Sequence, residues 1–142
     1  MELSFAFLAL YADYTDDKSL WVAGADFERL AIGVPAGITA IAQFSLVAKF
    51  RVSPAESAVP HFMRIECADP TGQRVSLNQN EQIPTKANEQ YPDRSSGAVV
   101  IAKIGMGFKS PGEYTFYLVV DDKEVKSIPL LVELPATPVK ED

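Results

Sequence analysis

The sequence holds one histidine, His61, and one cysteine, Cys67, and both could serve catalysis or bind a metal. A metal site of the cupin or jelly-roll oxygenase type takes at least two histidines from the protein, so a lone histidine argues against it. The alternation of apolar and polar residues places both side chains on one side of a strand, together with Met63 and Ile65. We therefore expect a partly covered histidine, and a cysteine that packs as a small apolar residue rather than acting as a nucleophile.

Three aspartates, Asp13, Asp16 and Asp17, are the candidate metal ligands. Carboxylate oxygens suit calcium, and loops at the end of a β-sandwich sometimes hold that ion. The spacing does not match an EF-hand loop, and no glycine stands at the sharp turn. The pattern therefore favours a solvated acidic turn over a metal site.

Other short motifs give no sign of a cofactor or a hydrolytic centre. Gly105-Met106-Gly107 lacks the third glycine and the following helix of a dinucleotide-binding loop, so it indicates a close backbone approach or a bend. The sequence contains no Gly-x-Ser-x-Gly elbow. We expect no cofactor and no catalytic residue, and an enzyme would need a partner to supply the missing groups.

The charge balance limits the classes of partner. Thirteen basic residues stand against 19 acidic ones, and the formal net charge of −6 repels phosphate backbones and anionic lipid. The apolar stretch from Leu3 to Ala12 is too short for a spanning helix and is preceded by Glu2 rather than by basic residues. A single cysteine cannot form an internal disulfide. We expect a cytoplasmic protein that binds neither nucleic acid nor membranes.

A two-residue alternation of apolar and polar side chains runs through most of the chain and predicts strands. In the first strand, Leu3, Phe5, Phe7 and Tyr11 are expected to share the inward side. The predicted strands cover, in order, residues 3–12, 19–24, 38–52, 61–67, 74–77, 98–108, 113–120 and 127–134. No segment has the pattern of an amphipathic helix. The sequence therefore predicts an all-β fold, a single antiparallel β-sandwich of Ig-like or jelly-roll-like character with about seven or eight strands.

Turn residues agree with this division into strands. Asp69-Pro70-Thr71-Gly72 has proline and glycine where a tight hairpin turn uses them. Pro129 has no N–H to donate, so the last strand should lie at a sheet edge or carry a bulge. We place the sandwich domain at residues 1–134 and predict a disordered tail over residues 135–142, which hold two prolines and three charges.

On three strands the residues that should face outward are also largely apolar. They are Ala6, Leu8 and Leu10, then Val99 and Ile101, and finally Thr115, Tyr117 and Val119. A sheet that is apolar on both faces must be covered on both. We expect a second copy of the chain to provide the cover, with Trp21 as an anchor at the margin. The alternative is that residues 27–32 and the adjacent turns cover these positions within one chain.

The polar interval from Asn78 to Ser96 is the longest predicted loop, and long loops in compact domains often carry function. Tyr91 is its aromatic anchor and our first expected contact site. We thus expect a non-catalytic interaction or accessory domain that self-associates. The alternative is a small-ligand or carbohydrate module, assisted by calcium, in which Trp21, Tyr14 and Tyr91 stack on a sugar beside the acidic turn.

Two sets of residues resemble a known family. The first set is Phe5-Ala6-Phe7-Leu8, Asp16-Asp17-Lys18-Ser19-Leu20, Gly24 and Phe27. The second set is Pro111-Gly112-Glu113-Tyr114, Phe116, Leu118, Val120-Asp121 and Pro129-Leu130. Together they resemble small bacterial proteins grouped only as a domain of unknown function, and the closing hairpin is similar to that of many Ig-like modules. The resemblance covers the two ends of the chain and implies no catalytic residue.

Overall fold

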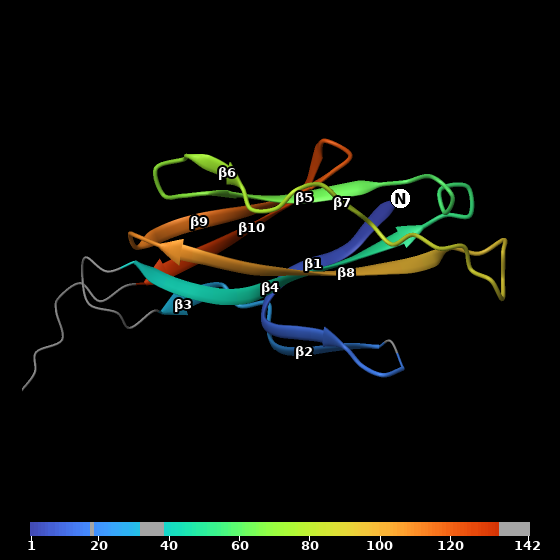
Figure 1. The fold of residues 1–142 in the computed structure, drawn as a ribbon, viewed down its shortest axis with the longest axis horizontal. Helices are drawn as coiled ribbons and strands as arrows, with labels where there is room; N and C mark the ends of the chain where they lie inside the picture. The colour runs from blue at the N-terminus through green and yellow to red at the C-terminus, as the bar shows by residue number, and fades with distance from the viewer. Residues whose placement is uncertain (18, 32–38, 134–142) are drawn as a thin grey trace, which may run out of the picture.

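Two β-sheets packed face to face form the protein, as the computed structural model shows for residues 1–17, 19–31 and 39–133 (Figure 1). The first sheet has the order β2-β1-β4-β8, with β1 (Glu2–Tyr14), β2 (Leu20–Ala25), β4 (Ala40–Val52) and β8 (Ser96–Phe108). The second has the order β3-β10-β9-β5-β6, with β3 (Arg29–Ala31), β10 (Lys123–Glu133), β9 (Gly112–Val120), β5 (Phe62–Ala68) and β6 (Arg74–Ser76), and β7 (Glu81–Gln82) also pairs with β5. The predicted tail at residues 135–142 lies outside the described residues.

The predicted all-β sandwich is confirmed, with two differences in detail. Ten strands are present rather than seven or eight, because β3 and β7 contain only three and two residues and leave no alternation to detect. The pairing of β3 with β10 is parallel, whereas the other pairings are antiparallel. Within the described residues, no helix is long and apolar enough to cross a bilayer.

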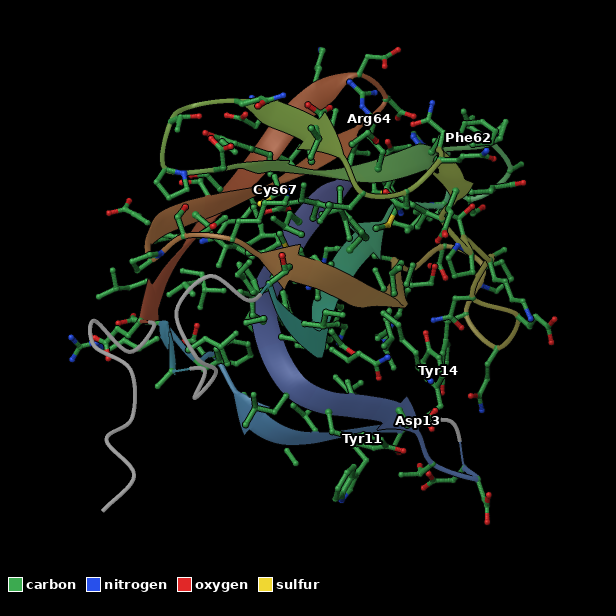
Figure 2. The ribbon with its side chains drawn as sticks, turned by 60° about the vertical axis from the view of Figure 1, so that its left-hand side comes forward. Tyr11, Asp13, Tyr14, Phe62, Arg64 and Cys67 are labelled. Atoms are coloured by element: carbon green, nitrogen blue, oxygen red, sulfur yellow. The ribbon has the colours of Figure 1, made fainter. Side chains whose placement is uncertain are left out.

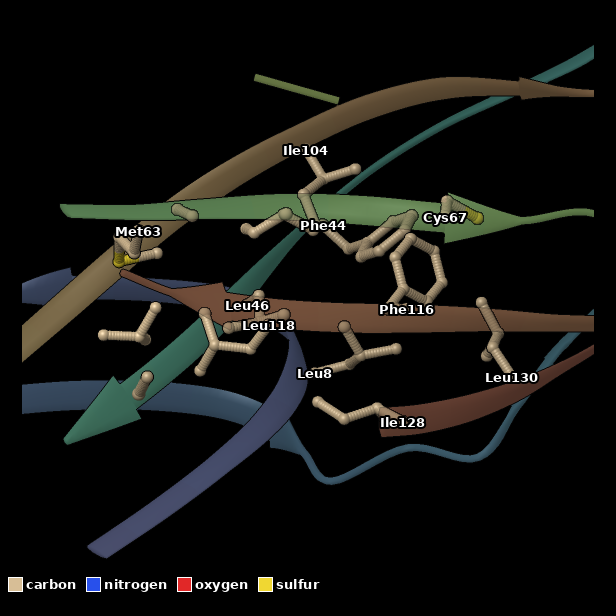
Figure 3. Close-up of a cluster of buried hydrophobic side chains, with 14 of the residues drawn as sticks. Leu8, Phe44, Leu46, Met63, Cys67, Ile104, Phe116, Leu118, Ile128 and Leu130 are labelled. Atoms are coloured by element: carbon tan, nitrogen blue, oxygen red, sulfur yellow. The ribbon is translucent and has the colours of Figure 1, made fainter. Parts of the chain in front are cut away.

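The core lies between the two sheets, and the residues that β4, β5, β8, β9 and β10 contribute to it are those that the alternation predicts (Figure 3). Phe44 of β4 meets Phe116 of β9 edge to face, with ring centres 5.5 Å apart. Burying one such side chain contributes about 1.5–3 kcal/mol. The inward residues of β4, β5 and β8–β10 that are buried include Leu46, Phe50, Met63, Ile65, Cys67, Ala98, Ile104, Phe108, Leu118, Ile128 and Leu130.

The inward and outward faces of β1 were predicted incorrectly beyond Leu3. The register between β1 and β4 shifts after Leu3, where Ser4 and Phe5 together oppose Lys49 and form a β-bulge. One extra residue exchanges the two faces. As a result Leu8 is fully buried in the core, while Phe5 and Phe7 stack on each other on the outer face with ring centres 5.5 Å apart.

β1 belongs to two pairings in succession and bends between them. Residues 2–9 pair with β4 and residues 9–14 pair with β2, so that Ala9 faces both Ser45 and Ala25. We call the hairpin of residues 10–17 and 19–25 the arm. Figure 1 shows the arm folded back beneath β4 and β8 rather than extending their sheet. Gly24, at φ +64°, allows this fold, because a Cβ there would lie 2.7 Å from Leu10 Cδ1.

The prediction that the last strand is an edge strand is wrong, because β10 lies between β3 and β9. Pro129 itself, however, has a strand partner on one side only among the described residues. It pairs with Thr115 of β9, whereas β3 reaches only Leu131–Glu133 on the other side of β10. The missing N–H of Pro129 therefore interrupts no ladder. The register shift in β10 lies farther along the hairpin, between Glu124 and Lys126.

Candidate interaction surface

The outer face of the arm carries an exposed aromatic pair. Tyr11 of β1 and Trp21 of β2 meet edge to face with ring centres 5.2 Å apart, and each is about half exposed, at 49% and 52%. Trp21 stands opposite Asp13 in the register, so Asp13 lies on the same face. The Tyr11 hydroxyl donates a 3.2 Å hydrogen bond to Asp13 Oδ2, which raises the pKa of Tyr11.

Tyr14 points the other way, toward the sandwich (Figure 2). It pairs with Leu20 on the inner face of the arm, and its hydroxyl donates a 2.8 Å hydrogen bond to the backbone oxygen of Val99 in β8. Burial raises the pKa of Tyr14 above its ordinary value. Since Trp21 and Tyr14 lie on opposite faces of the arm, one sugar ring cannot stack on both, and the constellation expected for carbohydrate binding does not form.

The arm itself covers part of the outer face of β4 and β8. Ala12 of the arm and Val47 of β4 are buried against each other, and Val22 and Ile101 pack at the margin of this small second core. Val99 and Ile101, expected under a second chain, are thus partly buried. The alternative cover, residues 27–32 and the adjacent turns, lies within the described residues only up to Ala31. Phe27 packs into the main core, with its ring 5.8 Å from that of Phe44.

On the second sheet, charged side chains cover the apolar outer residues. The guanidinium of Arg74 lies 3.7 Å from the centre of the Tyr117 ring. Val119, predicted to be an outward contact residue, is only 3% exposed. It stands opposite Arg64, whose guanidinium bonds to Glu66 and Asp122 at 2.6 Å each. Val119 therefore offers almost no accessible surface to a partner.

The acid Glu66 links the two arginines of this cover. It accepts hydrogen bonds from Arg64 Nε at 2.6 Å and from Arg74 Nε at 2.7 Å, and Arg74 also reaches Glu124 at 3.1 Å. The hydrogen bond from Arg64 lowers the pKa of Glu66. Tyr117 is partly exposed beneath Arg74, and its role as a contact residue stays a prediction.

A model of a family of unknown function, DUF6941, matches residues 4–133, which extend from β1 to the last residue of β10. The chain belongs to this family. The membership confirms the resemblance seen in the sequence to an uncharacterised family. No curated protein matches the chain.

The long loop of this DUF6941 chain is held in place at several points. Ile83 is fully buried, and its N–H donates a 2.8 Å hydrogen bond to the His61 backbone oxygen. Farther along, Tyr91 is 48% exposed, its N–H bonds to Asn88 Oδ1 at 2.9 Å, and the Arg94 guanidinium lies 4.9 Å from its ring centre. Tyr91 is thus accessible, as a contact site must be, and its role stays a prediction.

The candidate calcium ligands are used by the turn between β1 and β2. Asp13 Oδ1 accepts the Tyr14 N–H at 2.8 Å, and Asp17 Oδ1 accepts the Ser19 N–H at 3.2 Å and the Thr15 hydroxyl. The bond from Thr15 lowers the pKa of Asp17. Across the residues that the structure describes, Asp16 among them, no group of three or more acidic, histidine or cysteine side chains could hold a metal.

The single histidine, His61, and the single cysteine, Cys67, lie at opposite ends of β5. Cys67 is 2% exposed, and burial raises the pKa of its thiol to about 11, so it packs as an apolar residue. His61 Nδ1 lies 2.5 Å from Asp121 Oδ2, and its Nε2 lies 3.8 Å from Glu56. Sequence reasoning missed both partners, since Asp121 is 60 residues away and is reached only through the β5–β9 pairing.

Proposed function

We propose that this chain acts by binding rather than by catalysis, as an interaction domain that self-associates through the arm. In this proposal the free edge of β2 pairs with β2 of a second copy. Trp21 lies at the seam between the copies. The arm therefore serves both copies in the same way, which is the requirement of a two-fold symmetric contact.

The composition of β2 carries this proposal. Leu20–Ala25 reads LWVAGA, with no charged residue and no proline, and the strand stands at the end of its sheet with only β1 beside it among the described residues. Sheet edges present unpaired backbone N–H and C=O groups that can pair with another chain, and charges or prolines normally block them. The other edge strands carry such charges: Lys103 in β8, Arg29 in β3 and Arg74 in β6.

The exposed aromatic pair adds side-chain contact to the backbone pairing. Tryptophan and tyrosine dominate the binding energy of many interfaces, because a large rigid ring loses little entropy when it is buried. Trp21 is half exposed, as is its neighbour Tyr11. The proposed pairing would bury these rings beside the edge strand.

Net charge opposes this association and makes it salt dependent. Each copy carries a formal charge of −6, and Asp13, Asp16 and Asp17 lie at the tip of the arm. Two copies therefore repel each other at low ionic strength, and at 0.1 M salt the repulsion between charges more than about 10 Å apart is largely screened. We expect the dimer fraction to rise with salt concentration.

Light scattering across micromolar protein concentrations tests the proposal. The wild-type mass should rise toward that of two chains, and Trp21→Lys, which places a charge on the edge, should weaken association by about tenfold or more. Tyr91→Lys distinguishes the arm from the long loop, since this tyrosine is equally exposed: unchanged association supports the arm as the contact, and weakened association would assign the contact to the loop. Ala25→Lys, at the exposed end of β2, repeats the test without removing an aromatic ring. A wild-type mass of one chain at every concentration and salt level would overturn the proposal.

A further inference from the structure

Two cations stand side by side on the outer face of the first sheet, away from the exposed face of the arm. Lys49 and Arg51 are two residues apart on β4, so their side chains leave the same face of the strand. Arg51 lies between Glu2 of β1 and Gly97 of β8, and Lys49 lies between Phe5 and Val99. This end of the sheet therefore concentrates positive charge on a chain that is acidic as a whole.

A cavity of about 300 Å³ opens at these two residues. It is lined by Glu2, Ser4, Lys49, Arg51, Ser95, Ser96 and Gly97. A volume of this size lies at the lower end of the range for small-molecule sites. The side chains that line it carry two cations, one carboxylate and three hydroxyl groups.

Two departures from regular strand structure shape the cavity. The bulge after Leu3 adds Ser4 to the outer face, where its hydroxyl joins the lining. Gly97 leaves room for the stem of Lys49, because a Cβ at that position would lie 3.0 Å from Lys49 Cε. Lys49 is in consequence only partly exposed although it stands on an outer face.

The cations of the cavity are not neutralised by the described part of the chain. The salt bridges there engage Arg29, Arg64, Arg74, His61 and the amino terminus, but neither Lys49 nor Arg51. Glu2 lines the same cavity and forms no salt bridge with either cation. Two positive groups against one carboxylate leave the cavity with a net positive charge.

Of the three serine hydroxyls that line the cavity, one is already hydrogen bonded and two are, in the part of the chain that the structure describes, free to donate to a ligand. Ser96 already donates its hydroxyl proton to the Lys86 backbone oxygen at 2.5 Å. The hydroxyls of Ser4 and Ser95 form no hydrogen bond within the described residues. Lysine, arginine and two free hydroxyls together match the donors that bind phosphate oxygens.

We propose that this cavity binds a small phosphate-bearing ligand, with Lys49 and Arg51 contacting the phosphate oxygens and Ser4 and Ser95 donating hydrogen bonds. Glu2 stands at the same site and repels the anion, so it limits the affinity. Phosphate is preferred over a simple carboxylate because its larger negative charge and additional oxygen atoms can engage both cations and both hydroxyls.

The test is an NMR titration of the ¹⁵N-labelled full chain with inorganic phosphate and, in a separate arm, with glycerol phosphate. Saturable shifts should appear at the amides of Ser4, Lys49, Arg51 and Gly97. Lys49→Gln and Arg51→Gln should each weaken binding by about tenfold, because each removes a charge that attracts the anion. Glu2→Gln should tighten binding, because it removes a charge that repels the anion. If glycerol phosphate binds more tightly than inorganic phosphate, the site is assigned to phosphate esters. If the two dissociation constants are equal, the site is assigned to free phosphate.

Lys103→Gln is the matched control, because Lys103 lies on the outer face of the same sheet but outside this cavity. Its binding constant should equal that of the wild type. The proposal is overturned if no saturable shift appears at millimolar phosphate, if acetate binds as well as phosphate, or if the Lys49 and Arg51 variants bind like the wild type. These outcomes are independent of the mass measured for self-association, because the cavity is built from β1, β4 and β8 and not from β2.

Discussion

The Tyr14 hydroxyl donates a 2.8 Å hydrogen bond to the backbone oxygen of Val99, a residue 85 positions later in the chain. This bond joins the end of β1 to the edge strand β8 and so holds the arm against the outer face of its own sheet. The contact explains why an apolar outer face does not require a second chain along its whole length. Tyr14 was expected to contact a sugar, but in the structure its hydroxyl positions the arm.

Replacing Tyr14 by phenylalanine should loosen the arm while leaving the sandwich intact. The lost hydrogen bond is worth about 0.5–1.5 kcal/mol in general, and the half-exposed position of Tyr14 favours the lower end. Hydrogen exchange should become faster in residues 10–14 and 20–25 and stay unchanged in β5 and β9. Tyr11→Phe is the control, since its hydroxyl bonds only to the exposed Asp13 and should leave these exchange rates as they are.

A charge placed under the arm should destabilise the protein. Ala12 is 1% exposed against Val47, so Ala12→Asp would bury a carboxylate with no partner. We expect a loss of about 2 kcal/mol or more in the free energy of unfolding, measured by urea denaturation. Ala25→Asp, at the exposed end of β2, should cost far less. Equal stability of the two variants would show that the arm does not pack on β4 in solution.

Acid should weaken the contact between His61 and Asp121. The hydrogen bond from His61 lowers the pKa of Asp121 below its ordinary value of 3.8. A carboxyl whose pKa is lower in the folded state stabilises the fold above its unfolded-state pKa, and this contribution disappears as pH falls through the folded-state pKa. Asp121→Asn should therefore be less stable than the wild type at neutral pH and approach it in acid.

Asparagine is a suitable replacement because the backbone at Asp121 has φ +50°, and asparagine tolerates this conformation as well as aspartate does. The variant thus changes the charge without straining the turn between β9 and β10. Urea denaturation of both proteins across the acidic range measures the difference. A stability gap that stays constant with pH would contradict the assignment.

The Cys67 thiol should not react in the folded protein. Burial raises its pKa to about 11, so the thiolate that attacks alkylating reagents is scarce at neutral and mildly alkaline pH. Mass spectrometry after iodoacetamide treatment should show unmodified protein in buffer and complete modification in denaturing urea. Rapid labelling of the native chain would mean that the β5 end of the core opens readily.

Much of the fold could be predicted because long strands repeat their pattern. In β4 the alternation holds over 13 residues, so Phe44, Leu46 and Phe50 could be assigned to the core from the sequence alone. The strands β3 and β7 were missed, since three and two residues carry no periodicity. Their pairing depends on neighbours that only the tertiary structure supplies.

The outer surfaces could be predicted only in part, because the alternation of apolar and polar residues within a strand does not indicate which other segment covers a face of the sheet. The bulge at Ser4 reversed the faces of β1, and nothing in the composition of residues 3–5 marks a bulge. Val119 was predicted to be an open contact residue, but it is buried and stands opposite Arg64, which bonds to two acidic partners. Trp21, by contrast, is exposed as expected, since a single large aromatic residue on a short edge strand has few neighbours to cover it.

Hydrogen exchange at two protein concentrations tests most directly whether β2 is the seam between two copies. The backbone amides on the free side of Leu20–Ala25 are open in one chain and become hydrogen bonded when two copies pair. We predict that exchange in this strand slows in the concentrated sample, while the edge strand β6 exchanges at the same rate in both samples. Identical exchange of β2 at both concentrations would contradict the proposed self-association through the arm.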